Sequence, residues 1–198
     1  SIVYSAMILI GSIIYSYYRV GMNDYIQTVV QHSDFIQAEY VDPKEANIEF
    51  PDEKRNLIVI YLESLETTMF STEVSGGWDY TVMPELETIA KENINFSNTD
   101  ELGGARRVSG STWTIGALVG TTSGLPLKVP VEAEDYTSET FLMGATALGD
   151  VLKDEGYNLK FMFGSDADFG GRRQYFTKHG EYEIFDLLTA IERGYMTE

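Results

Sequence analysis

The chain has 198 residues, of which 43% are hydrophobic and 13% aromatic, and its formal net charge is −17. This composition is sufficient for a packed domain of ordinary size and excludes global disorder. The excess of acidic residues argues against nucleic acid as a partner, because phosphate binding needs clustered Lys and Arg. The absence of cysteine excludes disulfides, thiolate metal sites and a cysteine nucleophile.

An apolar run without any charged residue covers residues 2–18 and ends at Arg19. A helix needs about 20 residues to cross a bilayer, and this run is slightly shorter. Three tyrosines lie beside the arginine, as in the aromatic belts of membrane proteins. We therefore predict a transmembrane helix over residues 1–20; the alternative is a buried amphipathic helix.

The remainder of the chain divides into a polar segment and a domain. Residues 21–55 are rich in polar and acidic side chains and predict a juxtamembrane helix followed by a linker. From residue 56 onward, strand-like and helix-like runs alternate, which is typical of an α/β domain with a parallel sheet and right-handed crossovers. The expected strands are 56–62, 94–96 and 159–163, and the expected helices are 65–71, 84–91, 113–119 and 141–153.

Glu63 directly follows the most apolar of these strand-like runs, residues 57–62. Consecutive strand-forming apolar residues predict a buried parallel strand. Open α/β sheets place their chemistry just beyond the carboxyl ends of such strands. Glu63 is therefore a candidate oxygen ligand for a hard or borderline cation. The alternative is that it caps the turn or helix that follows.

Two hydroxyl residues, Ser111 and Thr112, precede the helix expected at 113–119. A hydroxyl in this position is either an N-cap or a nucleophile at the positive end of the helix dipole, where a phosphate would also bind. Such a hydroxyl needs a base or a metal to activate it. The two histidines, His32 and His179, form no Ser-His-Asp pattern with it. A metal ion is therefore the more economical activator.

The loop at residues 164–173 follows an expected strand and contains two aspartates, Arg172 and Arg173. Either arginine could clamp a phosphate in bidentate fashion, and the aspartates could hold a cation or pair with the arginines. His179 comes next and is either structural or a substrate-binding residue. The basic pair at residues 106–107 would attract an anionic substrate or lie in an exposed loop.

Three segments, at residues 60–66, 110–119 and 123–127, together resemble the membrane-bound phosphoglycerol transferases of the sulfatase/alkaline phosphatase superfamily, which include the lipoteichoic acid synthases. The resemblance covers about residues 56–186. It implies a mostly parallel sheet flanked by helices, with residues 56–198 as the N-terminal part of an extracellular catalytic domain. The apolar run at residues 1–20 would be the membrane helix that precedes this domain.

The resemblance also implies a reaction and a location. A phosphoglycerol group would pass from a phosphatidylglycerol-like donor to an envelope glycan or polymer, through a covalent intermediate on a hydroxyl residue. Mn²⁺ (or Mg²⁺) would be the cofactor. The enzyme would sit in the plasma membrane with its catalytic domain on the extracellular or periplasmic side.

Transferred residue by residue, the resemblance makes Glu63 a metal ligand and Arg172 a substrate-binding residue. Counted back from residues 124–126, the nucleophile, which also contacts the metal, falls on Ser111. The family has Thr at this position, and here Thr occurs one residue later, so Thr112 is the second candidate. The family's other metal ligands lie downstream of residue 198. We therefore expect the C-terminal part to be missing and the fragment to be inactive alone.

Two alternatives remain from the sequence. The first is another phosphotransferase or hydrolase of the superfamily, such as a phosphoethanolamine transferase or a sulfatase. The lack of cysteine, and of a Pro-x-Arg pattern after Ser111, argues against both. The second is a catalytically inactive, membrane-tethered binding module. An Asp-His pair at a strand end beyond residue 198 would favour the enzyme.

Overall fold

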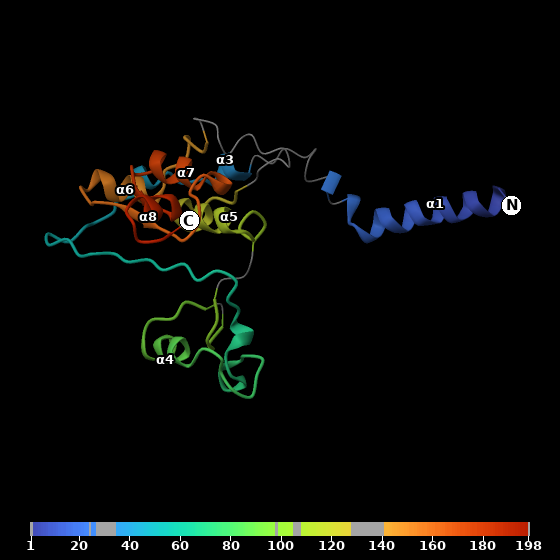
Figure 1. The fold of residues 1–198 in the computed structure, drawn as a ribbon, viewed down its shortest axis with the longest axis horizontal. Coiled ribbons are helices and arrows are strands. Elements are labelled where there is room, and N and C mark those ends of the chain that lie inside the picture. The colour runs from blue at the N-terminus through green and yellow to red at the C-terminus, as the bar shows by residue number, and fades with distance from the viewer. Residues whose placement is uncertain are drawn as a thin grey trace. The chain divides into compact units, whose positions relative to one another are not determined.

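A computed structural model describes residues 2–23, 25–26, 35–97, 99–104, 108–127 and 141–197 (Figure 1). The chain divides into two units, Ser1–Val41 and Asp42–Glu198. Three residues considered above, His32, Arg106 and Arg107, lie outside the described residues.

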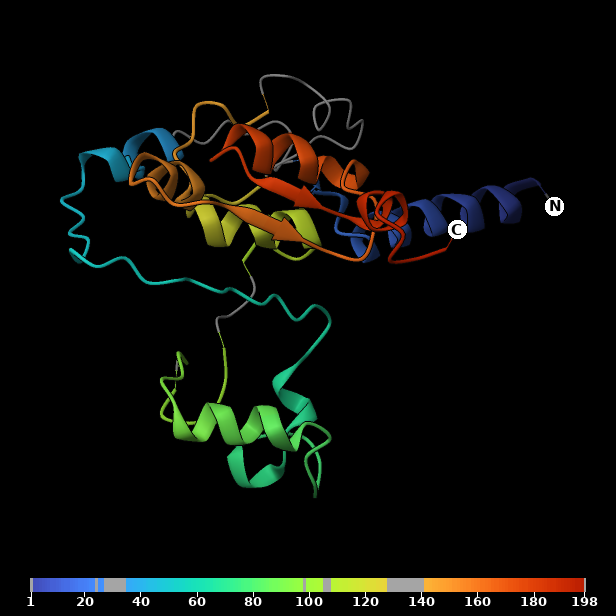
Figure 2. The same ribbon diagram turned by 60° about the vertical axis from the view of Figure 1, so that its left-hand side comes forward.

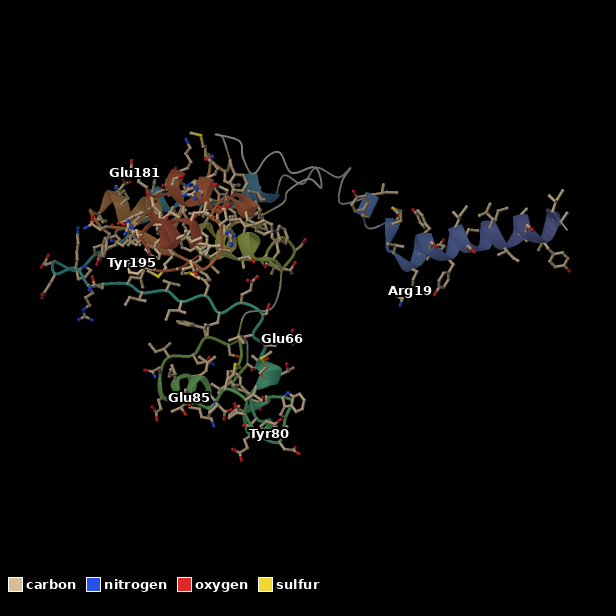
Figure 3. All side chains as sticks on the ribbon, in the orientation of Figure 1. Arg19, Glu66, Tyr80, Glu85, Glu181 and Tyr195 are labelled. Atoms are coloured by element: carbon tan, nitrogen blue, oxygen red, sulfur yellow. The ribbon has the colours of Figure 1, made fainter. Side chains whose placement is uncertain are left out.

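The first unit contains helix α1, Ile2–Arg19, and the short helix α3, Phe35–Glu39. None of the α1 side chains is buried, and they project on all sides of the helix up to Arg19 (Figure 3). The 18 residues have a mean hydropathy of 1.2. At 1.5 Å per residue the helix is about 27 Å long, close to the about 30 Å hydrocarbon core of a bilayer. The expected helix is therefore present, and by length and composition it is able to cross a membrane.

The second unit mixes helices with a small sheet. Among the described residues its elements, including single-turn 3₁₀ helices marked η, are η1 Pro43–Glu45, η2 Thr67–Met69, η3 Thr72–Val74, α4 Pro84–Glu92, α5 Thr114–Ser123, α6 Leu148–Asp154, β1 Lys160–Met162, η5 Phe169–Gly171, α7 Arg172–Lys178, β2 Glu183–Phe185 and α8 Leu187–Glu192.

Strands β1 and β2 form a parallel pair in which Phe161 lies opposite Ile184 (Figure 2). Helix α7 connects them and packs on β1 through Phe176, whose ring stacks on that of Phe161 at a centroid distance of 3.9 Å. Apolar side chains from α5, α7 and the loops before α6 complete the core: Ile115, Leu118, Val119, Leu127, Phe141, Ala147, Tyr175 and Phe176.

Two glycines allow α6 to approach the turn after α7. A Cβ added at Gly149 would collide with the carbonyl oxygen of His179, and one added at Gly180 would lie 2.7 Å from the backbone of Gly149. Gly180 also has φ of +110°, a conformation that favours glycine. Backbone therefore rests directly on backbone between these two elements.

The structure confirms the α/β class in outline, because helices pack around a parallel strand pair. In the part of the chain that it describes, the sheet has two strands, and residues 56–62 are not one of them. Their prediction as a buried strand is wrong for this structure: they run without regular pairing, and Ile58 is 81% exposed. The physical reason is that a strand needs a neighbour for its backbone hydrogen bonds, and none is paired with this run.

Other boundaries also shift. Residues 94–96 are irregular and exposed rather than a strand, and the segment 65–71 contains only the single turn η2. The helix expected to start at residue 141 begins at Leu148. Its predicted end is confirmed, since Gly156 follows with φ of +79°.

Candidate functional site

A groove of about 880 Å³ lies between the apolar run 56–61 and the segment that contains β1. Its lining includes Glu63, Thr114 and Arg172. The groove thus brings together two sequence-predicted site residues, Glu63 and Arg172, with a third that the sequence reasoning missed.

The missed residue is Thr114, the first residue of α5. Its hydroxyl donates a hydrogen bond to the Glu63 carboxylate. A second contact fastens the same two segments, because the Tyr61 hydroxyl lies 2.9 Å from the Thr121 hydroxyl further along α5. Glu63 therefore faces the N-terminal end of the helix, where the backbone dipole favours negative charge. A signal for Thr114 was present in the sequence, as a hydroxyl in the first turn of the helix expected at 113–119.

Ser111 and Thr112 lie outside this groove. The Ser111 hydroxyl donates to the Val108 carbonyl at 2.9 Å, and the Ser111 amide donates to the same carbonyl at 3.2 Å. Gly110, with φ of +86°, completes the turn. Thr112 is exposed. In this structure the hydroxyl of Ser111 is engaged in a local turn, and the catalytic role of either residue stays a prediction.

Arg172 is held in a fixed orientation at the groove. Its Nε donates to the Phe169 carbonyl at 2.9 Å, and its Nη2 donates to the Asp166 carbonyl at 2.8 Å. The guanidinium also lies over the ring of Phe163, 4.8 Å from the centroid. Because a guanidinium carries five N–H donors, these two bonds leave donors for an anion. The side chain itself is largely buried, so its charge is poorly screened there.

Arg173 is occupied by ion pairs. Its Nε donates to Asp168 at 2.6 Å and its Nη2 to Asp186 at 2.8 Å. These contacts, with that to Asp168 the largest, raise the pKa of Arg173. The sequence allowed the loop aspartates either to hold a cation or to pair with an arginine. Asp168 pairs with Arg173. Between the adjacent arginines, Arg172 is thus the one presented to the groove.

His179 is buried, with only 4% of its surface exposed. Its Nδ1 lies 2.9 Å from an oxygen of Asp150, which also accepts a hydrogen bond from the Ala147 amide at the start of α6. The ring packs against Tyr175 at a centroid distance of 4.8 Å. His179 does not line the groove. Its position supports the structural alternative, and its binding of substrate stays a prediction.

Comparisons with known proteins point to one family. The chain is 32% identical over 191 residues to "Phosphoglycerol transferase I" of Xanthomonas axonopodis pv. citri (strain 306), an alignment that covers 95% of the chain and 25% of the relative. It is 37% identical over 150 residues to "Phosphoglycerol transferase I" of Escherichia coli O6:K15:H31 (strain 536 / UPEC), covering 75% of the chain and 18% of the relative. This chain belongs to the phosphoglycerol transferase family.

The chain spans about a quarter or less of the length of these phosphoglycerol transferases. No family model matches it, and neither does any solved structure. The assignment to the phosphoglycerol transferase family therefore rests on the curated relatives.

The oxygen ligands at Glu63 are of the kind that a hard cation binds, but they are too few to hold it alone. A carboxylate and a hydroxyl, from Glu63 and Thr114, are the oxygen ligands that Mg²⁺ and Mn²⁺ accept. Among the described residues, however, no group of three or more His, Cys, Asp or Glu side chains is placed to hold a metal ion. For a phosphoglycerol transferase that uses a metal, these two residues would be one side of a shell that needs further ligands.

Proposed function

We propose that the chain is part of a membrane-anchored transferase that moves phosphoglycerol from a phosphatidylglycerol-like donor to an envelope glycan or polymer. The observation that carries the proposal is the hydrogen bond from the Thr114 hydroxyl to Glu63 in the groove that Arg172 also lines. The names of the curated relatives support the same reaction. The helix α1 supports the anchor by its length and composition. The proposal includes a catalytic domain on the outer side of the plasma membrane.

Each of the three groove residues has a distinct role in the proposed reaction. The oxygen of Thr114 attacks the donor phosphorus, the bond to the diacylglycerol oxygen breaks, and that oxygen leaves with a proton. Glu63 orients the Thr114 hydroxyl and accepts its hydrogen bond before attack. Arg172 binds the non-bridging phosphate oxygens, and the first turn of α5 stabilises their growing charge. An acceptor hydroxyl then attacks the same phosphorus, the bond from phosphorus to the Thr114 oxygen breaks, and the acceptor's proton passes to that oxygen.

A Mn²⁺ or Mg²⁺ ion bound at Glu63 would add Lewis acid chemistry, lowering the pKa of the attacking hydroxyl and neutralising phosphate charge. The residues of this chain that would face it are Glu63 and Thr114. Ser111 and Thr112, the candidates favoured by spacing, remain alternatives for the nucleophile. The hydrogen bond to Glu63 favours Thr114 over both.

The test is to trap the intermediate in the full-length protein. The enzyme is incubated with Mn²⁺ and a donor labelled in its glycerol headgroup, without acceptor, and the adduct is mapped by peptide mass spectrometry. We expect a phosphoglycerol adduct on Thr114. An adduct on Ser111 or Thr112 would overturn the role of Thr114 while retaining the reaction. Donor turnover without an adduct on any of the three would overturn the covalent mechanism.

The second candidate function is a catalytically inactive, membrane-tethered binding module. It is allowed by one departure from the family's pattern, Ser111 at the position where the family has threonine. The two candidates differ in a simple assay. Release of diacylglycerol from the donor by the full-length protein supports the enzyme, whereas donor binding without release supports the module.

A further inference from the structure

Helices α5 and α7 each contribute their first residue to the groove. Thr114 begins α5 and Arg172 begins α7, and both line the groove. In the proposed reaction one phosphate contacts both helix ends. The separation of these two ends therefore decides whether the phosphate can reach both at once. Whatever fixes α5 against α7 bears directly on the site.

Close to the groove, the two helices approach through apolar groups. A Cβ built on Gly170, in the turn that leads into α7, would be 3.8 Å from the Ile115 side chain. Ile115 also belongs to the same core cluster as Phe176 of α7. Apolar contacts are not directional, so they hold the helices together without fixing how far one helix has slid along the other.

A directional contact joins the helices further from the groove. The hydroxyl oxygens of Thr122 on α5 and Tyr175 on α7 lie 2.6 Å apart. Thr122 donates its own proton to the Leu118 carbonyl at 2.7 Å, so Tyr175 is the donor between the two hydroxyls. Burial raises the pKa of Tyr175. The phenol therefore keeps the proton that it donates to Thr122.

The ring of Tyr175 is held on more than one side. The side chain is fully buried. Phe141 and Phe176 pack edge-on against it, at centroid distances of 6.4 Å and 5.1 Å. Because the ring is confined in this way, its hydroxyl meets Thr122 at one position along α5. The hydrogen bond thus adds the fixed register that the apolar contacts lack.

The two contacts act at different heights of α5. Ile115 lies at the start of the helix and Thr122 near its end, about 10 Å further along the axis at 1.5 Å per residue. Contacts at two heights fix the angle between α5 and α7 as well as their separation. With only the contact at Ile115, the helices are free to pivot, and Arg172 shifts relative to Thr114.

We propose that Tyr175 and Thr122 are positioning residues, whose hydrogen bond sets the register of α5 against α7 and with it the separation of Thr114 from Arg172. The two residues act through Arg172 and Thr114 rather than on the phosphate itself. The inference rests on the proposed function in one respect, that a phosphate binds between these two helix ends.

Binding of glycerol phosphate to the full-length protein, measured by calorimetry, tests the positioning without requiring turnover. Tyr175→Phe keeps the ring and removes its hydroxyl. We expect about 10-fold weaker affinity, because the phosphate no longer reaches Arg172 and the first turn of α5 together. Thr122→Val should have the same effect, whereas Thr122→Ser keeps the acceptor and should stay within about 2-fold of the parent. Unchanged affinity in Tyr175→Phe would overturn the proposal.

The control is Thr177→Val, also in α7. Its hydroxyl donates to the Arg173 carbonyl within the same helix, so its loss should leave the affinity unchanged. Absence of glycerol phosphate binding by the parent would overturn the proposal too, since no phosphate would then lie between the two helix ends.

Arg172→Lys separates positioning from a general loss of structure. The flexible lysine stem lets the cation follow the phosphate, so Tyr175→Phe should cost less than about 2-fold in this background. An equal loss in both backgrounds would mean that Tyr175 only supports the fold, and would overturn the proposal. The expected coupling in a protein that releases no diacylglycerol from the lipid donor would support the positioning and overturn the proposed function alone.

Discussion

The Thr114 hydroxyl donates a hydrogen bond to the Glu63 carboxylate across 51 positions of sequence. This contact joins the first residue of a helix to the residue that ends the apolar run. It makes Thr114 and Glu63 the two groups whose replacement is most informative about the groove.

Replacing Thr114 with Val keeps the shape of the side chain and removes the hydroxyl. If this oxygen is the nucleophile, transfer of phosphoglycerol by the full-length enzyme should fall by about 1,000-fold or more, because no covalent intermediate forms. Thr114→Ser keeps a hydroxyl and should retain most of the rate. The control is Thr177→Val in α7, which loses a hydroxyl that donates to main-chain carbonyls of its own helix and lies outside the groove. Full activity of Thr114→Val would contradict the assignment.

Glu63→Gln keeps the size of the side chain and removes its charge. A carboxylate that binds a divalent cation contributes through that charge, so Mn²⁺ affinity measured by calorimetry on the full-length protein should weaken at least about 10-fold. Glu66→Gln, three residues later and outside the groove, is the matched control. Equal affinities in the two variants would exclude Glu63 as a ligand.

The buried Asp186 carboxylate accepts hydrogen bonds from Ala167, Arg173 and Thr189. Burial by itself would raise its pKa, but hydrogen bonds from Thr189 and Ala167 and the charge of Arg173 outweigh burial and lower the pKa to about 2. Because this lies below the ordinary value of 3.8, the carboxylate stabilises the fold fully above about pH 4 and loses this effect as the pH falls through about 2.

Asp186→Asn should therefore lower the free energy of unfolding by about 1–3 kcal/mol at pH 7, because the buried carboxylate accepts hydrogen bonds from the Ala167 and Thr189 amides and the half-buried Arg173 loses one of its two counter-charges. Denaturant unfolding at pH 7 and at pH 3 measures both the loss and its pH dependence. Asp168→Asn, which removes a mostly exposed partner of the same arginine, should cost no more than about 1 kcal/mol. A variant as stable as the parent would show that Asp186 is dispensable.

His179→Gln separates the two roles considered for this histidine. A structural role predicts a loss of about 1–3 kcal/mol in unfolding free energy, since the contact with Asp150 is disturbed, and an unchanged KM for the donor. A substrate-binding role predicts a higher KM at nearly unchanged stability. The buried position of the ring leads us to expect the first result.

Ile10→Lys introduces a charge near the middle of α1. In a membrane-spanning helix this costs about 3 kcal/mol, so a larger fraction of the protein should be released when membranes are washed at alkaline pH. Val20→Lys, one residue beyond the helix, is the control because a cation there can reach the interface. Equal retention of both variants would contradict a membrane span.

The elements that were predictable from sequence are those that local signals define. Pro84 marks the start of α4, and Gly156 follows the end of α6. The strand prediction that failed concerns a feature that depends on residues far away in the sequence. The run 57–62 has the composition of a strand, yet it is unpaired here because strand formation is decided by a neighbour. The resemblance, counted back from residues 124–126, points to Ser111, and that assignment stays a prediction. The hydroxyl that meets Glu63 belongs to Thr114, and this contact depends on how α5 packs against a segment far away in sequence.

The contact between Gly149 and Gly180 restricts how this part of the protein can change during evolution. In most packed positions, a larger side chain on one partner can be matched by a smaller one on the other. Here both partners already lack a side chain, so neither has any volume to give up. Any substitution at either position must move α6 away from the turn that carries His179, and a relative with a larger residue there must hold these two segments further apart.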